Sequence, residues 1–95
     1  MLLDLSAQAK RDIERLHQDG AKKFGPVQAA SYTGGLLDLL DLIQSNPMMA
    51  RERPEFRRQM RLIRYRSHVV FYRVETDIIH VLRILHGKQD WMEHI

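Results

Sequence analysis

The last third of the chain has the periodicity of β-strands, and this feature constrains the fold more than any other. The sequence from residue 60, "MRLIRYRSHVVFYRVETDIIHVLRILHG", alternates apolar and polar residues. It is rich in Val, Ile, Tyr and Phe, which strands favour. Short polar interruptions occur at Ser67 and at Thr76–Asp77. The spacing predicts three strands joined by tight turns, over residues 60–66, 68–75 and 78–86.

The first half has a different pattern, in which a short strand precedes a helix. "LLDL" at Leu2–Leu5 alternates, and the following Ser6 is a typical helix N-cap. Ala9, Ile13 and Leu16 then recur at helical spacing. We expect this first helix to cover about residues 7–19 and to end at Gly20, which tolerates the left-handed conformation of a helix end.

A second helix is expected between two prolines. Pro26 suits a first helical turn, where its missing N–H costs nothing, and Pro47 prevents continuation. Gly34–Gly35 in its middle costs about 1 kcal/mol per glycine relative to alanine. Either the helix kinks there or another element packs very close, and we favour close packing against the first helix.

The element order β-α-α-β-β-β predicts an α+β fold in a single domain over residues 1–95. The first strand has to pair with the last three, so the helices form a hairpin on one face of a small, mostly antiparallel sheet. Alternation places Val81, Arg83 and Leu85 on one side of the last strand, with Leu82 and Ile84 on the other. We expect the more open face to gather Arg64, Arg73 and Arg83.

Positive charge is concentrated in the second half. Residues 1–50 hold five Lys/Arg and six Asp/Glu, a net charge of −1, whereas residues 51–95 hold ten and six, a net charge of +4. Seven of these residues are arginines between Arg51 and Arg66. Arginine binds carboxylate and phosphate in the same bidentate way, so an anionic partner is expected, either nucleic acid or an acidic protein segment. A simple solvated basic surface is the alternative.

Several functional classes lack support in the sequence. The chain has no cysteine, which is typical of a reducing cytoplasm, and we expect a cytoplasmic protein without a signal peptide or a membrane span. The histidines lack the spacing of a metal site, and "TGGLLD" lacks the spacing and the lysine of a phosphate-binding loop. We therefore expect no metal and no cofactor.

The segment "SHVVFYRVETDIIHVLRILHGKQD" carries the most specific pattern of the chain. It contains a Ser-His turn, the aromatic strand "VFYR", a polar turn, and an "I-x-V-x-R-I-L-H-G" strand that is followed by an Asp. This combination resembles the C-terminal part of ParE toxins, which belong to the RelE/ParE superfamily of toxin–antitoxin systems. "LSAQAKRDIERL" and "FGPVQAASYTGGLLDLLDLIQSNP" are similar to the first strand and the two helices of this family. The resemblance covers nearly the whole chain.

The resemblance implies a β-α-α-β-β-β fold and a toxin that binds DNA gyrase and traps its cleaved-DNA complex, without catalysis. It also implies a ParD-like antitoxin with an acidic, disordered C-terminal part. The toxin is expected to associate with operator DNA only indirectly, through this antitoxin. For the antitoxin we expect an apolar groove on the helical hairpin together with arginines, formed by Ile13, Leu16, Tyr32, Leu36, Arg57, Arg58 and Arg61. For the target we expect a surface formed by Arg64, Arg73, Arg83, His86, Asp90 and Trp91.

Two alternative functions stay open at this point. A RelE-like messenger-RNA endoribonuclease needs cations on the phosphate and groups that transfer protons, which Arg64, Arg73 and Arg83 with His86 or Tyr72 can supply. A protein-interaction module without toxicity is the third reading.

The C-terminal "HGKQDWMEHI" has two interpretations. In the first, Gly87 releases a projecting tail, Asp90 folds back onto an arginine, and Trp91 anchors the target, so that the tail is the toxic element. In the second, Trp91 closes the end of a small core. We predict the first.

Overall fold

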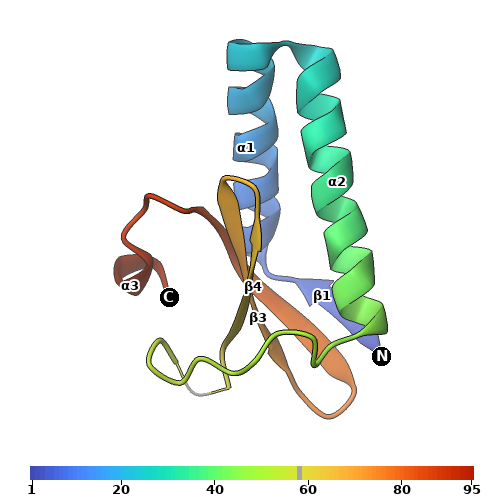
Figure 1. The fold of residues 1–95 in the computed structure, drawn as a ribbon, viewed down its shortest axis with the longest axis vertical. Helices are drawn as coiled ribbons and strands as arrows, with labels where there is room; N and C mark the ends of the chain where they lie inside the picture. The colour runs from blue at the N-terminus through green and yellow to red at the C-terminus, as the bar shows by residue number, and fades with distance from the viewer. Residues whose placement is uncertain (58) are drawn as a thin grey trace.

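The computed structural model describes residues 1–57 and 59–95 and arranges them in two main layers, a helical hairpin and a four-stranded sheet (Figure 1). The predicted order β-α-α-β-β-β is confirmed, and a short C-terminal helix is added to it. The elements are β1 (Leu2–Leu5), α1 (Ala7–Phe24), α2 (Pro26–Ser45), β2 (Arg61–Tyr65), β3 (His68–Val74), β4 (Ile78–His86) and α3 (Trp91–His94).

The sheet is mixed, with the strand order β1-β4-β3-β2. β2, β3 and β4 form an antiparallel meander, as the two short turns predict. β1 is parallel to β4 and pairs only with its first half, from Leu2 opposite Ile78 to Leu5 opposite Val81. The chain then enters α1 through Ser6, whose hydroxyl oxygen accepts a hydrogen bond from the Ala9 N–H at 2.9 Å. This N-cap is the predicted one.

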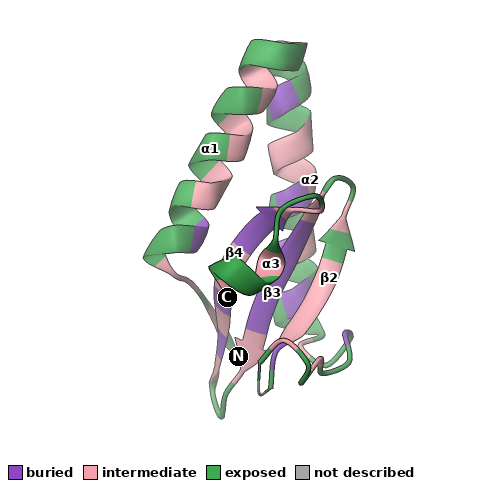
Figure 2. Ribbon diagram, turned by 90° about the vertical axis from the view of Figure 1, so that its left-hand side faces the viewer, coloured by how far each residue is buried: buried purple, intermediate pink, exposed green. Residues whose placement is uncertain are grey.

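Apolar residues bury both faces of the sheet. Toward the hairpin, Leu36 and Ile43 of α2 meet Tyr72, Ile79 and Val81 in the main core. The opposite face carries a second cluster formed by Met60, Val69, Phe71 and Leu85, against which Phe56, Leu62, Leu82, Trp91 and Ile95 pack. Figure 2 shows α3 lying over this side of the buried strands β3 and β4. The face expected to be open is therefore largely covered by Phe56 and Met60 from the segment before β2 and by α3.

A β-bulge in β4 reverses part of the predicted alternation. Tyr72 pairs with Val81 but Phe71 pairs with Arg83, so Leu82 is an extra residue on the β4 side. Val81 and Ile84 consequently share the hairpin-facing core, whereas Leu82 and Leu85 belong to the second cluster. The prediction that Val81 and Leu85 lie on one face, opposite Leu82 and Ile84, is wrong because it assumed an uninterrupted period of two.

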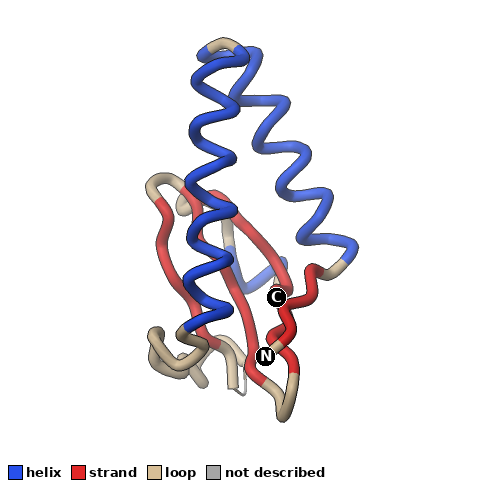
Figure 3. The backbone as a smooth tube through the Cα atoms, turned by 90° about the vertical axis from the view of Figure 1, so that its right-hand side faces the viewer, coloured by secondary structure: helices blue, strands red, loops and turns tan. Residues whose placement is uncertain are grey.

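The first helix is longer than predicted. It continues through Gly20 to Phe24, and the chain turns into α2 at Gly25, whose φ of 90° lies in the region that glycine tolerates. Gly20 serves packing instead of termination, since a Cβ placed there would lie 3.6 Å from the Cβ of Ala29. The two helices thus approach closely at Gly20 and Ala29, and the hairpin extends well beyond the end of the sheet (Figure 3).

The glycine pair of α2 does not pack against α1. A Cβ at Gly34 would meet nothing within 4 Å, whereas a Cβ at Gly35 would lie 2.2 Å from the hydroxyl oxygen of Tyr65 in β2. That hydroxyl donates a hydrogen bond to the backbone carbonyl of Tyr32 at 2.8 Å. The expectation of close packing holds for Gly35, but its partner is the sheet, and α2 runs as one helix from Pro26 to Ser45.

The two neighbouring glycines are expected to respond in opposite directions to alanine. Gly34→Ala should stabilise the protein by about 1 kcal/mol, because alanine is the better helix former and the space is open. Gly35→Ala should destabilise it by about 1–2 kcal/mol, because the methyl group displaces the Tyr65 ring. Urea unfolding of both variants measures the difference, and equal shifts would contradict the packing described.

Among residues 1–57 and 59–95, no helix combines the length and the apolar character needed to cross a membrane.

Candidate functional site

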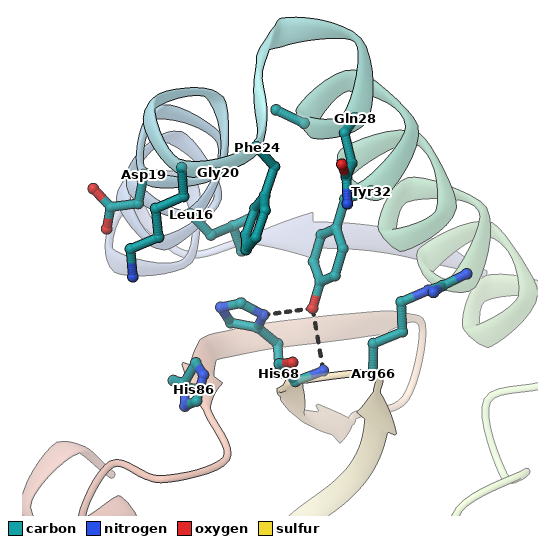
Figure 4. A pocket seen from close by; sticks show the side chains of 12 residues that line it. Leu16, Asp19, Gly20, Phe24, Gln28, Tyr32, Arg66, His68 and His86 are labelled. Carbon is teal, nitrogen blue, oxygen red and sulfur yellow. Dashed lines mark hydrogen bonds between the residues drawn. The ribbon is translucent and has the colours of Figure 1, made fainter.

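A cleft opens where the hairpin extends past the end of the sheet. It has a volume of about 440 Å³ and lies between the α1–α2 end of the hairpin and the β2–β3 turn. Figure 4 shows Tyr32 of α2 pointing down to His68 at the start of β3, with Arg66 and His86 at the rim. A second hollow of about 300 Å³ adjoins it and shares Leu16, Asp19 and both histidines.

The Tyr32 hydroxyl group organises the cleft floor. Its oxygen lies 2.7 Å from Nδ1 of His68 and accepts a hydrogen bond from the backbone N–H of Ser67 at 3.2 Å. Burial raises the pKa of Tyr32, so the hydroxyl keeps its proton, and its two acceptors are Nδ1 of His68 and the Tyr65 carbonyl at 3.5 Å. The turn between β2 and β3 is therefore tied to the middle of α2, and Arg66 adopts a positive φ of 50° within it.

His68 and His86 form a pair across the β3–β4 ladder. They are directly paired residues, and their ring centroids lie 5.2 Å apart at an interplanar angle of 77°. Burial lowers the pKa of His68, and the neighbouring His86 lowers it further, while Asp12 acts in the opposite direction. The His68 ring is consequently neutral near pH 7.

An ion pair at the edge of the second hollow connects α1 to β4. Asp12 accepts two hydrogen bonds from the Arg83 guanidinium, at 2.8 and 2.9 Å, and a third from the backbone N–H of Ile84 at 2.9 Å. Only 15% of the Arg83 side chain and 11% of the Asp12 side chain are exposed. The hydrogen bonds to Asp12 raise the pKa of Arg83 above its already high usual value. Asp12 thus binds β4 beyond the end of β1, where no strand covers it among the described residues.

The residues predicted for the target surface do not form one cluster. Arg64 is exposed at one end of the sheet, paired with Val69, whereas Arg73 is paired with His80 near the other end. Arg83 belongs to the ion pair with Asp12, and His86 to the histidine pair. The three arginines do lie on the side away from the main core, as expected, but Phe71 and its cluster separate Arg64 from Arg73.

The C-terminal segment folds back over the sheet instead of projecting from it. The Trp91 ring lies 5.5 Å from the Phe71 ring and 5.8 Å from the Phe56 ring, and its Nε1–H donates to the His86 carbonyl at 3.2 Å. Asp90 precedes α3 as its N-cap residue and makes no ion pair with a described arginine. The structure favours the second interpretation, in which Trp91 closes the end of the core.

The residues predicted for antitoxin binding have mixed positions. Ile13, Leu16 and Tyr32 are partly exposed along the hairpin, and Leu16 and Tyr32 border the cleft. Leu36 is fully buried, so it has no surface to offer a partner. Arg57 is exposed, and Arg58 lies outside the described residues. The Arg61 guanidinium donates a hydrogen bond to the Ala50 carbonyl, and one of its nitrogens lies 3.6 Å from a carboxylate oxygen of Glu52.

The nuclease candidates are only partly brought together, with Arg83 and His86 both bordering the second hollow. Tyr72 is fully buried, and its hydroxyl donates to the Pro47 carbonyl at 3.0 Å. Arg83 is bound to Asp12, and His86 lies at the other end of β4 from the pairing partner of Arg73. Within residues 1–57 and 59–95, no group of three or more His, Cys, Asp or Glu residues is placed to hold a metal ion.

Sequence reasoning missed His68, Asp12 and Arg66 as members of this site. For His68, the sequence did offer a signal. It is the first residue of one predicted strand and so lies near the end of the next strand of the meander, where His86 is. Asp12 gave no signal, because an acidic residue on the polar side of an amphipathic helix is ordinarily solvated.

Comparison with known proteins identifies the family. The model of the family described as "ParE toxin of type II toxin-antitoxin system, parDE" matches residues 3–91. The chain belongs to the ParE toxin family.

Other members of the ParE family are similar over nearly their whole length. "Toxin ParE1" of Caulobacter vibrioides is 31% identical over 91 residues, which cover 96% of this chain and 94% of the relative. "Toxin ParE1" of Mycobacterium tuberculosis is 32% identical over 87 residues, covering 90% and 89%. A solved structure titled "Chromosomal ParDE TA system from P. aeruginosa" superimposes with a TM-score of 0.79 over 90% of this chain and 95% of that chain. At 20% identity, that likeness shows the shared ParE fold alone.

Proposed function

We propose that this ParE-family toxin acts in the cytoplasm by binding DNA gyrase and trapping its cleaved-DNA complex, without catalysing a reaction. The family match over residues 3–91 is the observation that carries the proposal. The positions of the nuclease candidates support a binding mode of action, because a metal-free nuclease needs an acid, a base and free cations around one phosphate. Here Tyr72 is buried and Arg83 is neutralised by Asp12.

The proposed gyrase-binding surface is the side of the molecule that carries α3. It includes the exposed Arg64, the partly exposed Arg73, and the exposed N-cap Asp90. In this proposal Arg83, His86 and Trp91 act on the target indirectly, by holding the end of β4 and α3 in place, since Trp91 is bound to the His86 carbonyl and Arg83 contacts the His94 carbonyl at 3.4 Å.

A ParD-like antitoxin is the proposed partner, and the helical hairpin is its proposed binding surface. Val27, Leu37 and Leu42 of α2 are 84%, 45% and 47% exposed, so the helix offers apolar side chains to a partner. Leu16 and Tyr32 add partly exposed side chains at the cleft, Ile13 and Leu16 also pack against the main core, and the exposed Arg57 supplies positive charge. An amphipathic, acidic segment that folds as it binds has the complementary chemistry.

The antitoxin proposal predicts a strong, salt-dependent stabilisation. The toxin mixed with antitoxin at about 100 times the dissociation constant should gain about 2.7 kcal/mol of stability and melt at a higher temperature. The affinity should fall as salt rises, because the exposed charges are screened. Thermal melts at two salt concentrations measure both effects, and an unchanged melting temperature at saturation would refute the partner.

A gyrase assay tests the proposed activity against the ribonuclease alternative. Purified toxin should inhibit gyrase supercoiling and increase the cleaved DNA recovered after denaturation, whereas messenger RNA on translating ribosomes should stay intact. The antitoxin, added first, should abolish inhibition. RNA cleavage that is lost in His86→Gln, with gyrase unaffected, would replace the proposal by the ribonuclease function.

A further inference from the structure

We propose that the space beside His68 and His86 is an anion-binding site that holds one side-chain carboxylate of an acidic peptide segment. Hydrogen-bond donors and positive charges of the described residues define the site. It rests on the proposed function only in naming the antitoxin as the source of that segment.

The hydrogen bonds on the two rings define where their protons lie. When Tyr32 donates to Nδ1 of His68, the neutral His68 ring carries its proton on Nε2. The protonated ring carries a proton on Nε2 as well, and Tyr32 then donates to the Tyr65 carbonyl. The backbone N–H of Lys88 lies 3.1 Å from Nδ1 of His86, and a backbone N–H can only donate. His86 therefore also carries its proton on Nε2 when it is neutral. Neither Nε2–H has an acceptor among the described residues, so both are available to a ligand.

Both histidines line connected hollows. His68 and His86 border the cleft of about 440 Å³ and the adjoining hollow of about 300 Å³. The rings are also close to each other, with centroids 5.2 Å apart. A carboxylate has two oxygens and can accept one hydrogen bond from each ring.

The charges around the hollows favour an anion. The charged side chains that border them from α1, the β2–β3 turn and β4 are Asp12, Arg15, Asp19, Lys23, Arg66 and Arg83. Because Arg83 and Asp12 neutralise each other, Arg15, Lys23 and Arg66 remain against Asp19, an excess of two positive charges before either histidine is protonated. His94 of α3 borders the second hollow as a further titratable group.

Two features favour a peptide carboxylate over a phosphate. Asp19 borders both hollows, so a doubly charged phosphate meets more repulsion there than a singly charged carboxylate. Leu16 and Phe24 supply apolar walls, and Phe24 is 63% exposed, which suits the apolar neighbours of an acidic residue in an amphipathic segment.

Binding should take up a proton and tighten as the pH falls. In the free protein, burial and the neighbouring His86 lower the pKa of His68. A bound carboxylate adds the opposite charge beside the ring and raises that pKa. The complex then holds more protons than the free protein between the two pKa values, so affinity increases as the pH falls through that window.

Nuclear magnetic resonance of the histidine ring nitrogens tests the site directly. The probe is a hexapeptide of alternating Leu and Glu with blocked ends, and its analogue with Gln for Glu is the matched control. The Glu peptide should shift the ring signals of His68 and His86, raise the pKa of His68, and bind about tenfold more tightly at pH 6 than at pH 8. The signals of His80, which lies near Asp4 and Glu75 outside the cleft, should not move.

Variants distinguish binding at this site from nonspecific binding of the peptide. His68→Gln should weaken the peptide and remove most of its pH dependence, whereas His80→Gln should do neither. An unchanged His68 titration at saturating peptide would overturn the inference, and this measurement needs only the unmodified protein. Inorganic phosphate that produces the same shifts at equal ionic strength and lower concentration would overturn the choice of a carboxylate.

The experiment uses neither antitoxin nor gyrase, so its failure is distinguishable from failure of the proposed function. Peptide binding as described, in a protein that leaves gyrase active, would retain the site and refute the toxin activity. Gyrase inhibition by a protein whose histidines ignore the peptide would refute the site alone.

Discussion

Replacing Asp12 by alanine is expected to destabilise the protein by about 3–4 kcal/mol, which is a large part of the stability of a domain this size. The substitution leaves the mostly buried Arg83 guanidinium without its partner and removes the acceptor of the Ile84 N–H. α1 then loses its polar attachment to the part of β4 that β1 does not reach. Urea unfolding measures the loss.

A double-mutant cycle shows how much of that cost is the unpaired charge. Arg83→Met combined with Asp12→Ala should cost less than the two single variants together, by about 1–3 kcal/mol, because neither charge is left buried alone. Glu14→Ala is the matched control on the exposed side of α1 and should change stability by less than about 0.5 kcal/mol. An Asp12→Ala variant as stable as Glu14→Ala would show that the ion pair does not contribute to the stability of the fold.

Trp91→Ala is expected to cost about 3 kcal/mol, since truncation of a large packed aromatic leaves a cavity. The ring contacts Phe56 and Phe71, and its N–H satisfies the His86 carbonyl, so the second cluster loses its cover. Thermal unfolding of the purified variant measures this. The result distinguishes the two interpretations of the tail, because a freely projecting effector would lose its activity without losing stability.

Met92→Ala provides the control beside Trp91. Met92 is 59% exposed, so its truncation should leave stability within about 0.5 kcal/mol of the parent protein. Gyrase inhibition is best compared at a temperature where both variants are folded. If Trp91→Ala melts like Met92→Ala yet fails to inhibit gyrase, then the tryptophan contacts the target itself, and the packing described is not what fixes α3.

Local patterns in the sequence were sufficient for the elements and their order. The strand over Ile78–His86 was predicted with the bounds that the structure shows, and the other two strands of the meander to within one residue at most ends. These segments have a strict period of two and polar turns, so local preference and tertiary packing agree. The Ser6 N-cap and the role of Pro26 at a helix start also need only neighbouring residues.

The helix ends and glycines show where local rules were overridden. Gly20 looked like a helix end, but the hairpin continues to Gly25 because Gly20 allows Ala29 to approach and the extended helices bury apolar surface between them. The Gly34–Gly35 pair signalled close packing, yet only the structure shows that Tyr65 of β2 is the neighbour, and that it lies against Gly35 alone. The partner of a small residue is a property of the packed fold.

The candidate site depends on a single irregularity that has no local signal. With uninterrupted pairing from Val74 opposite Ile79, His68 would lie opposite Leu85; the extra residue at Leu82 moves His86 into that place. The bulge also turns Ile84 toward the helices and Leu85 toward the second cluster. The sequence by itself determined which residues form strands and helices, through periodicity and turn chemistry. Only the tertiary structure decided that two histidines, a tyrosine and an ion pair meet, because that register is set by simultaneous packing on both faces of the sheet.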